Sequence, residues 1–386
     1  MSASTFSVAE AEARGTLADG FQWDAQDITQ GKNGTRVATV PYFQRPGEEK
    51  IWAGAGGVLT SARDLATWVS MLLNNGRHPY TNETIIPSEI VEHVAHGRSV
   101  SHGKPEFPEL SPKVYGAGQW RYSYQAHDII EHGGNNPGYK TQVARFPNDN
   151  LGIITLSNDA KGGGFIIEAV KFRIADELLG LKELDWNDRF EKQWNDYVEK
   201  AQKLTPRPNK PEFPSAPYTS LAENTFHHPT YGTLQPCLVP ASVHSYMDST
   251  YAQSLQCLNF LSSYAVQRIL SVSDLSTPTY IIPWKRFFTS HLRLAHFDGN
   301  LFNVTTIFSN ADVREKEGYS HGDGKGGPVS KGDILVELDE HFEVEWVRGE
   351  EEGLAFKGGF WGMEGLDARS PVGVGKESAE VWFAKV

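Results

Sequence analysis

The sequence is poor in cysteine and has no long apolar run, and each absence excludes a broad class of protein. Only two cysteines, Cys237 and Cys257, occur in 386 residues, which excludes a disulfide-rich scaffold and a zinc site built from four cysteines. The two could form one bridge or remain separate thiols. No stretch approaches the roughly 18 consecutive apolar residues of a transmembrane helix. The sequence therefore predicts no membrane span.

Positive charge is also scarce. Lys and Arg number 36 against 48 Asp and Glu, a formal net charge of -12, and no basic block occurs. Because nothing would compensate phosphate charge, we expect neither nucleic acid nor an anionic membrane surface as a partner. Residues 1–20 have no basic region and no apolar region of a signal peptide. Localisation is left open, with secretion still compatible with a chain that lacks an N-terminal segment.

Two short motifs suggest cofactors only weakly. Residues 322–327 match the dinucleotide fingerprint G-x-G-x-x-G, but Pro328 follows in a glycine-rich loop where the fingerprint needs a helix. His227 and His228 lack a second pair of ligands at metal-binding spacing. We therefore expect no cofactor and no metal.

One stretch is dense in proline and predicts a domain boundary. Five prolines between residues 205 and 217 interrupt any helix or central strand and favour an extended connector: Pro206, Pro208, Pro211, Pro214 and Pro217. We expect a first domain over residues 1–204, a linker over 205–217 and a second domain over 218–386.

The best-defined helix in the first domain is predicted at residues 61–75. Ser61 and Asp64 form a capping box, and Gly76 suits the C′ position. Apolar residues then recur at i, i+3, i+4 and i+7, which predicts a buried face: Leu65, Trp68, Val69 and Leu72.

Strands and further helices follow in the first domain. Residues 141–146 and 151–156 predict strands joined by the turn 147–150. Helical patterns cover 165–179, ending at Gly180, and 185–202. Strands followed by packing helices predict an α+β or α/β layer.

The second domain reads as mainly β. Polar and apolar residues alternate over 342–346 and 379–383, the run 334–338 is strand-like, and few long helical patterns occur. A barrel or sandwich is expected, and no internal repeat of 20 to 50 residues is found.

Several spaced motifs cover most of residues 1–179: Gly56-Gly57, Ser61, Asp64-Leu65-Ala66, Leu72-Leu73, Gly76, Tyr115-Gly116 and His132-Gly133-Gly134 through Gly138-Tyr139. In type and order they resemble the serine β-lactamase and penicillin-binding-protein superfamily, in particular its β-lactamase-related hydrolases and esterases of fungal type. The resemblance implies an α+β fold, with an incomplete β-lactamase-like antiparallel sheet and flanking helices. Residues 223–234 and the ending Ala379–Phe383 resemble a lipocalin-like barrel appended to some relatives.

The resemblance also implies a site. His132-Gly133-Gly134 occupies the place of the family's Lys-Thr-Gly or His-x-Gly motif, on the strand bordering the active site. Glycine there lets a substrate backbone approach, while His132 orients a carboxylate or relays a proton. The backbone N–H of Asn135 would be one half of an oxyanion hole. The alternative is a strand-end histidine followed by a glycine turn.

The attacking group of that family is not found. Its Ser-x-x-Lys motif places a lysine beside the serine as base, and its Tyr-x-Asn element lies on a second loop. Both would precede the segment where this chain begins. Ser101–Lys104 and Tyr80–Asn82 match the two patterns, but in reversed order, and Gly103 and Pro105 make a poor helix start. We interpret both matches as coincidences.

Three functions follow as hypotheses. The first is a serine acyl hydrolase (an esterase-, transpeptidase- or β-lactamase-like enzyme with a small-molecule or peptide acyl substrate), catalytically incomplete in this chain. The second is a non-catalytic, hydrolase-like ligand-binding protein. The third is an assembly module, because without the family's early strands residues 151–156 would form an exposed apolar sheet edge. The oligomeric state is left open.

Overall fold

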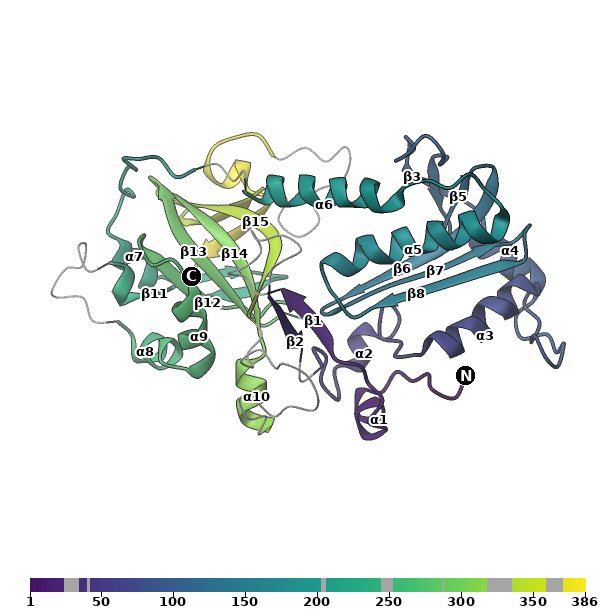
Figure 1. Ribbon diagram of the computed structural model, residues 1–386. Coiled ribbons are helices and arrows are strands. Elements are labelled where there is room, and N and C mark those ends of the chain that lie inside the picture. Colours follow the sequence, from purple (N-terminus) through teal and green to yellow (C-terminus); the bar gives the residue numbers. More distant parts are fainter. Residues whose placement is uncertain are drawn as a thin grey trace. The chain divides into compact units, whose positions relative to one another are not determined.

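The computed structural model describes residues 1–23, 35–39, 42–202, 206–243, 253–286, 288–317, 335–358 and 371–386. The chain divides into two compact units (Figure 1): residues 1–23 with 31–198, and residues 24–30 with 199–386. The linker at 205–217, with domains at 1–204 and 218–386, stays a prediction.

Unit 1 is built on an antiparallel sheet with the strand order β3-β4-β5-β6-β7-β8. Its strands are β3 (Ser99–His102), β4 (Lys113–Tyr115), β5 (Trp120–Tyr124), β6 (His127–Asn136), β7 (Tyr139–Phe146) and β8 (Leu151–Ser157). A separate two-stranded sheet pairs β1 (Gly20–Trp23) with β2 (Arg36–Thr39). The helices of this unit are α1 (Val8–Ala13), α2 (Glu49–Trp52), α3 (Ala62–Leu73), α4 (Ser88–Ala95), α5 (Gly162–Leu179) and α6 (Trp186–Gln202).

Helices cover both faces of this sheet (Figure 1). Ile153 of β8 joins the buried cluster of α5 and α6, in which Phe172 stacks on Trp186 with ring centroids 4.1 Å apart. The neighbouring Gly152 faces α3, where an added Cβ would lie 2.5 Å from Val69 Cγ1. Because consecutive strand residues point to opposite faces, α5 and α3 lie on opposite sides of β8.

The helix predicted at 61–75 is confirmed as α3, with corrections at its ends and face. The amide of Asp64 donates to Ser61 Oγ at 3.2 Å, so the cap is present. Asn75, with φ +52°, takes the left-handed C′ position predicted for Gly76, and the Gly76 amide donates to Met71 O at 2.9 Å in a Schellman pattern. Trp68 is 38% exposed rather than buried, because Met71 takes the inward position.

The predicted hairpin and the two following helices are confirmed. β7 and β8 pair from Lys140 with Ser157 to Phe146 with Leu151, so the turn is residues 147–150. α5 ends at Gly180, whose φ is +64°. Within the described strands β8 pairs with β7 alone and lies at the edge of the sheet, and Leu156 is 42% exposed.

Unit 2 is built on a nine-stranded antiparallel sheet that curls into a half-barrel (Figure 1). The order is β10-β9-β17-β16-β15-β14-β13-β12-β11, so the described strands leave the sheet open between β10 and β11. These strands are β9 (Phe226–His228), β10 (Gly232–Leu234), β11 (Cys237–Leu238), β12 (Thr279–Pro283), β13 (His291–Asp298), β14 (Leu301–Ser309), β15 (Leu335–Val347), β16 (Gly353–Lys357) and β17 (Val381–Lys385). The α+β class is confirmed, with a half-barrel in the place of the expected barrel.

Short helices and one disulfide complete unit 2. The helices, which the sequence patterns did not predict, are α7 (Tyr218–Ala222), α8 (Leu255–Leu261), α9 (Tyr264–Val272) and α10 (Ala311–Glu317). Cys257 of α8 is disulfide-bonded to Cys237 of β11, which resolves the two alternatives left open by the sequence. The G-x-G-x-x-G match at 322–327 lies outside the described residues.

Candidate functional site

The site predicted from the resemblance lies on β6, where the sheet narrows. β5 pairs with residues 127–131 of β6 only, whereas β7 pairs with residues 130–136. Among the described strands, residues 132–136 therefore have a neighbour on one side alone. His132, Gly133, Gly134 and Asn135 all lie in this half-open segment.

His132 is exposed and is held by hydrogen bonds at both ring nitrogens. Its Nδ1 lies 2.6 Å from the carbonyl oxygen of Gly133, and its Nε2 lies 3.0 Å from the hydroxyl of Tyr115. A carbonyl only accepts, so Nδ1 carries hydrogen in this arrangement and Nε2 of the neutral ring accepts from Tyr115. Because Nε2 accepts from a hydroxyl, it can exchange a proton through that hydroxyl, which suits a proton-transfer role.

Two aromatic side chains flank the imidazole. Trp120 stacks on the His132 ring with centroids 4.6 Å apart and an interplanar angle of 18°. Tyr115 lies edge-on to Trp120 at 5.3 Å. Both come from the segment Tyr115–Trp120, of which sequence analysis used only Tyr115 and Gly116, as motif matches. Two aromatic residues flanking a Gly-Ala-Gly turn were the signal that could have indicated a packed site.

The two glycines after His132 are covered by side chains of β7. A Cβ added to Gly134 would lie 2.4 Å from Thr141 Oγ1, and one added to Gly133 would lie 2.7 Å from Gln142 Oε1. Each glycine thus makes room for its own cross-strand partner. This is a packing reason for glycine, in addition to the substrate approach expected from the resemblance.

The end of β6 is tied to its surroundings by amide side chains. Lys140 Nζ donates to Asn135 Oδ1 at 2.6 Å, and Asn136 Nδ2 donates to the carbonyl of Gly56 at 3.1 Å. The structure thereby brings the Gly56-Gly57 segment next to the strand of His132, although Gly56 and Asn136 are 80 residues apart in the sequence.

Neither of the two motif matches interpreted as coincidences supplies a hydrogen-bond partner of His132 among the described residues. Ser101 Oγ accepts from Trp120 Nε1 at 3.2 Å and lies 3.1 Å from His102 Nδ1. Tyr80 is 86% exposed. Within the described residues, the hydrogen bonds of the His132 ring join it to Tyr115 and Gly133, and neither Ser101 nor Tyr80 is among its partners.

A buried ionic network lies beneath the same strand. Glu131 precedes His132 and so points to the opposite face, where Lys171 Nζ donates to Glu131 Oε2 at 2.8 Å, to Glu168 Oε2 at 2.7 Å and to the Tyr122 hydroxyl at 3.2 Å. Tyr122 in turn donates to Glu131 Oε1 at 2.8 Å. Sequence reasoning missed this network because charged residues in a helix and a strand are typical of exposed faces.

The pKa shifts within this network show which carboxylate compensates the charge of Lys171. Burial opposes the charge of Lys171, but Glu131, Tyr122 and Glu168 outweigh it and hold the pKa of the amine well above its ordinary value. Burial also favours the neutral acid at Glu131, yet Lys171 lowers the pKa of that carboxyl below its usual range. Burial raises the pKa of Glu168, which Lys171 offsets only in part. Glu131 is therefore the principal anion of Lys171.

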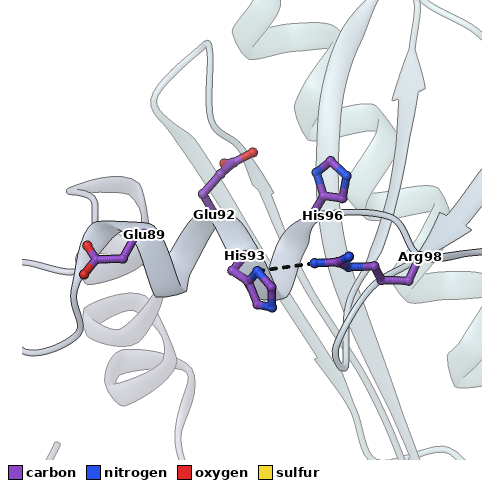
Figure 2. A pocket seen from close by; sticks show the side chains of 5 residues that line it. All are labelled: Glu89, Glu92, His93, His96 and Arg98. Atoms are coloured by element: carbon purple, nitrogen blue, oxygen red, sulfur yellow. Dashed lines mark hydrogen bonds between the residues drawn. The ribbon is translucent and has the colours of Figure 1, made fainter.

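A separate surface hollow of about 350 Å³ lies on α4 (Figure 2). Its lining residues are Glu89, Glu92, His93, His96 and Arg98. All five are exposed, and Arg98 donates to His93 Nδ1 at 3.3 Å. None of the predicted site residues lines it. In the described part of the chain, no group of three or more His, Cys, Asp or Glu side chains is arranged to hold a metal ion.

Over the described residues, no helix has the length and apolar character needed to cross a membrane.

Part of this chain is similar to a described protein family. The family model named Beta-lactamase matches residues 3–173. A protein named unguisins hydrolase ungD, from Aspergillus violaceofuscus, is 27% identical over 234 residues, which are 55% of this chain and 40% of that protein. A second protein, named unguisins hydrolase ungD′, from Aspergillus campestris, is 25% identical over 192 residues, 47% of this chain and 34% of its own length. The matched region thus spans about two-fifths or less of these relatives.

Two solved structures show weaker likeness. A D-stereospecific amidohydrolase from Streptomyces has a TM-score of 0.27 and 16% identity, covering 38% of this chain and 36% of its own. SurE has a TM-score of 0.30 and 14% identity, covering 88% of this chain and 53% of its own.

Proposed function

We propose that residues 3–173 belong to the serine β-lactamase and penicillin-binding-protein superfamily and that the chain supplies one wall of the acyl-transfer site of a serine hydrolase; the match to the Beta-lactamase family model and the likeness to ungD support this. The observation that carries the proposal is the arrangement of His132 on the half-open segment of β6, exposed and anchored at both ring nitrogens. The two relatives named as hydrolases support hydrolysis as the reaction class.

The residues of β6 have distinct roles in this proposal. Attack of a serine oxygen on an ester, amide or β-lactam carbonyl places negative charge on the carbonyl oxygen, and the backbone N–H of Asn135 would be one of two donors that stabilise it. The leaving group then needs a proton, which His132 would relay or guide by orienting the substrate. Gly133 and Gly134 keep the strand free of side chains of its own.

We further propose that the nucleophile lies outside residues 1–386, in a Ser-x-x-Lys segment of a longer polypeptide. The edge position of β8 supports this, because among the described strands its outer side has no partner and another strand could pair there. The small share of each relative that the chain matches agrees with the same proposal.

Fluorophosphonate labelling tests the proposal, because only an activated serine forms the adduct. We expect no adduct on the 386-residue chain, and an adduct on the polypeptide that includes the in-frame sequence upstream of Met1. In that longer polypeptide His132→Gln should lower the labelling rate by about 100-fold or more. His127→Gln on the same strand, where His127 Nδ1 lies 2.9 Å from Asp149 Oδ2, is the matched control and should label normally.

Each contrary result has a definite meaning. An adduct on Ser101 or another serine of the chain itself would overturn the location of the nucleophile. A longer polypeptide that contains no Ser-x-x-Lys and takes no label would overturn the hydrolase proposal and favour a non-catalytic ligand-binding protein.

A further inference from the structure

We propose that Tyr115 and Trp120 are positioning residues that fix the tautomer and the ring plane of His132. The catalytic role of these two residues rests on the proposed function, because they would keep His132 in the tautomer and orientation that proton transfer needs. The structural content of the proposal can be tested without any activity.

The two hydrogen-bond partners of His132 select one tautomer of its ring. With the Gly133 carbonyl 2.6 Å from Nδ1 and the Tyr115 hydroxyl 3.0 Å from Nε2, only the Nδ1–H form gives the neutral ring two hydrogen bonds. After proton uptake, Nε2–H donates to the Tyr115 oxygen while Nδ1–H still donates to Gly133. Tyr115 can therefore hold the ring in both protonation states, because a hydroxyl both donates and accepts.

Trp120 fixes the plane of the His132 ring. Trp120 covers one face of the imidazole at 4.6 Å in a nearly parallel stack, and its own Nε1–H is fixed by Ser101 Oγ at 3.2 Å. An indole that is anchored at its nitrogen cannot slide along the histidine without losing that bond. Ser101 thus acts in this arrangement as an acceptor that orients Trp120.

Tyr115 and Trp120 are held in place by the end of α4. The turn between them packs on the C-terminal end of α4: the amide of Ala117 donates to Val94 O at 2.9 Å, and Arg98 N donates to Tyr115 O at 2.8 Å. A Cβ added to Gly116 would lie 2.5 Å from Val94 O and 2.8 Å from His96 O. Glycine at 116 therefore allows the close approach that docks the turn on the helix.

Nitrogen-15 NMR of the histidine rings tests the assignment at alkaline pH, where imidazole side chains are neutral. We expect His132 in the Nδ1–H form. Two internal references should show the opposite form, because their Nδ1 accepts backbone amides: His78 from Thr81 N at 3.1 Å, and His228 from Thr230 N at 3.1 Å. Finding His132 as Nε2–H in the unaltered protein would overturn the proposal.

Two substitutions separate positioning from general damage. Tyr115→Phe keeps the ring but removes the hydroxyl, and should convert His132 to a mixture of tautomers, whereas the matched control Tyr80→Phe should leave it unchanged. Trp120→Leu should make the His132 ring mobile, and Trp120→Phe should restore most of the order by keeping an aromatic face. If neither Tyr115→Phe nor Trp120→Leu alters the His132 signals while the protein stays folded, the proposal is wrong.

The activity arm distinguishes this proposal from the proposed function. In the polypeptide that labels with fluorophosphonate, Tyr115→Phe should slow labelling by about 10-fold or more with little change in reagent affinity. If no polypeptide labels, the proposed function fails while the tautomer result stands. If labelling occurs and Tyr115→Phe leaves its rate unchanged, the positioning role fails alone.

Discussion

At the scale of single residues, the molecule depends on a few close approaches that allow no alternative side chain. Gly116 is one such case, since the atoms that an added Cβ would meet are backbone carbonyl oxygens of Val94 and His96. A backbone atom cannot rotate away as a side chain can. The steric restriction at this position is therefore rigid.

We predict that Gly116→Ala destabilises unit 1 by about 1–3 kcal/mol, the usual effect of overpacking. It should also displace Tyr115 and so reproduce part of the Tyr115→Phe phenotype in the His132 signals. Urea unfolding measures the first effect. Gly103→Ala is the matched control, because its Cβ would meet only Val100 Cγ1 at 3.9 Å. Equal stability of the two variants would contradict the packing argument.

Lys171 is a second residue that cannot be replaced without cost. Its side chain is 0% exposed, and its amine is bonded to two carboxylates and a phenol. We predict that Lys171→Met lowers the free energy of unfolding by about 3–5 kcal/mol, since it leaves Glu131 as a buried charge without its cation. The double variant Lys171→Met/Glu131→Leu should recover much of that loss. A loss that stays the same in the double variant would show that the charge was not the cause.

The pH dependence of this network follows from the directions of its pKa shifts. The lowered pKa of Glu131 means that its contribution is present above the usual carboxyl range and is lost as pH falls through its folded-state pKa. The raised pKa of Glu168 works in the opposite sense, so stability decreases as pH rises through the interval where Glu168 ionises. In Lys171→Met the deficit should shrink as pH falls, because an isolated Glu131 then takes up a proton; denaturant titrations across the acid range measure this.

At the scale of secondary-structure elements, the first turn of α3 serves two purposes. Ser61 caps the helix, but the Asp64 carboxylate does not close the predicted capping box. Instead it accepts from the Ala3 amide and the Ser4 hydroxyl, both at 2.8 Å. These bonds, that of Ser4 first, lower the pKa of Asp64. The carboxylate thus ties the start of the chain to the helix.

We predict that Asp64→Ala increases hydrogen exchange in residues 2–5, whereas Ser61→Ala costs about 1 kcal/mol of helix stability and leaves that segment protected. In the unaltered protein the tether should be present above the usual carboxyl range and be lost as pH falls through the lowered pKa of Asp64. Hydrogen exchange followed by mass spectrometry reports both variants. Protection of residues 2–5 that survives Asp64→Ala would show that the backbone pairing of Thr5 with Leu59 is sufficient.

At the scale of the whole molecule, the two units differ in how they are stabilised. Unit 1 contains the ionic network of Lys171 and the aromatic cluster of Trp186. The half-barrel of unit 2 has a large apolar interior and one disulfide beside a smaller cluster. The disulfide spans a sequence separation of 20 residues and joins α8 to β11.

We predict that reduction of the Cys237–Cys257 bond lowers the free energy of unfolding of unit 2 by about 3 kcal/mol, through the loop that it closes. Peptides from unit 2 should lose protection against hydrogen exchange, whereas peptides from the sheet of unit 1 should not. The variant Cys237→Ser/Cys257→Ser should behave as the reduced protein and not respond to reductant. An unaltered protein equally stable with and without reductant would refute this.

Turns and helix ends that depend on a few neighbouring residues could be predicted from the sequence alone. The turn 147–150 between two apolar runs, the periodic helix after Ser61 and the stop at Gly180 all appear in the structure where expected, because caps, turns and periodicity act within a few residues. The spaced motifs also indicated the family resemblance, and the match of residues 3–173 to the family model named Beta-lactamase agrees with it.

Contacts between residues distant in sequence depend on the tertiary structure. Trp120 stacks on His132, Asn136 bonds to Gly56, and Lys171 pairs with Glu131. The inner face of α3 holds Met71 and not Trp68, which depends on the neighbouring elements. Periodicity cannot show that a lysine of a helix is buried, because its buried charge is tolerated only when a carboxylate from another element, here Glu131 of β6, lies beside it. The sequence therefore supplies the residues of the proposed site as candidates, and only the fold shows that β4, β5, β6 and the end of α4 bring them together.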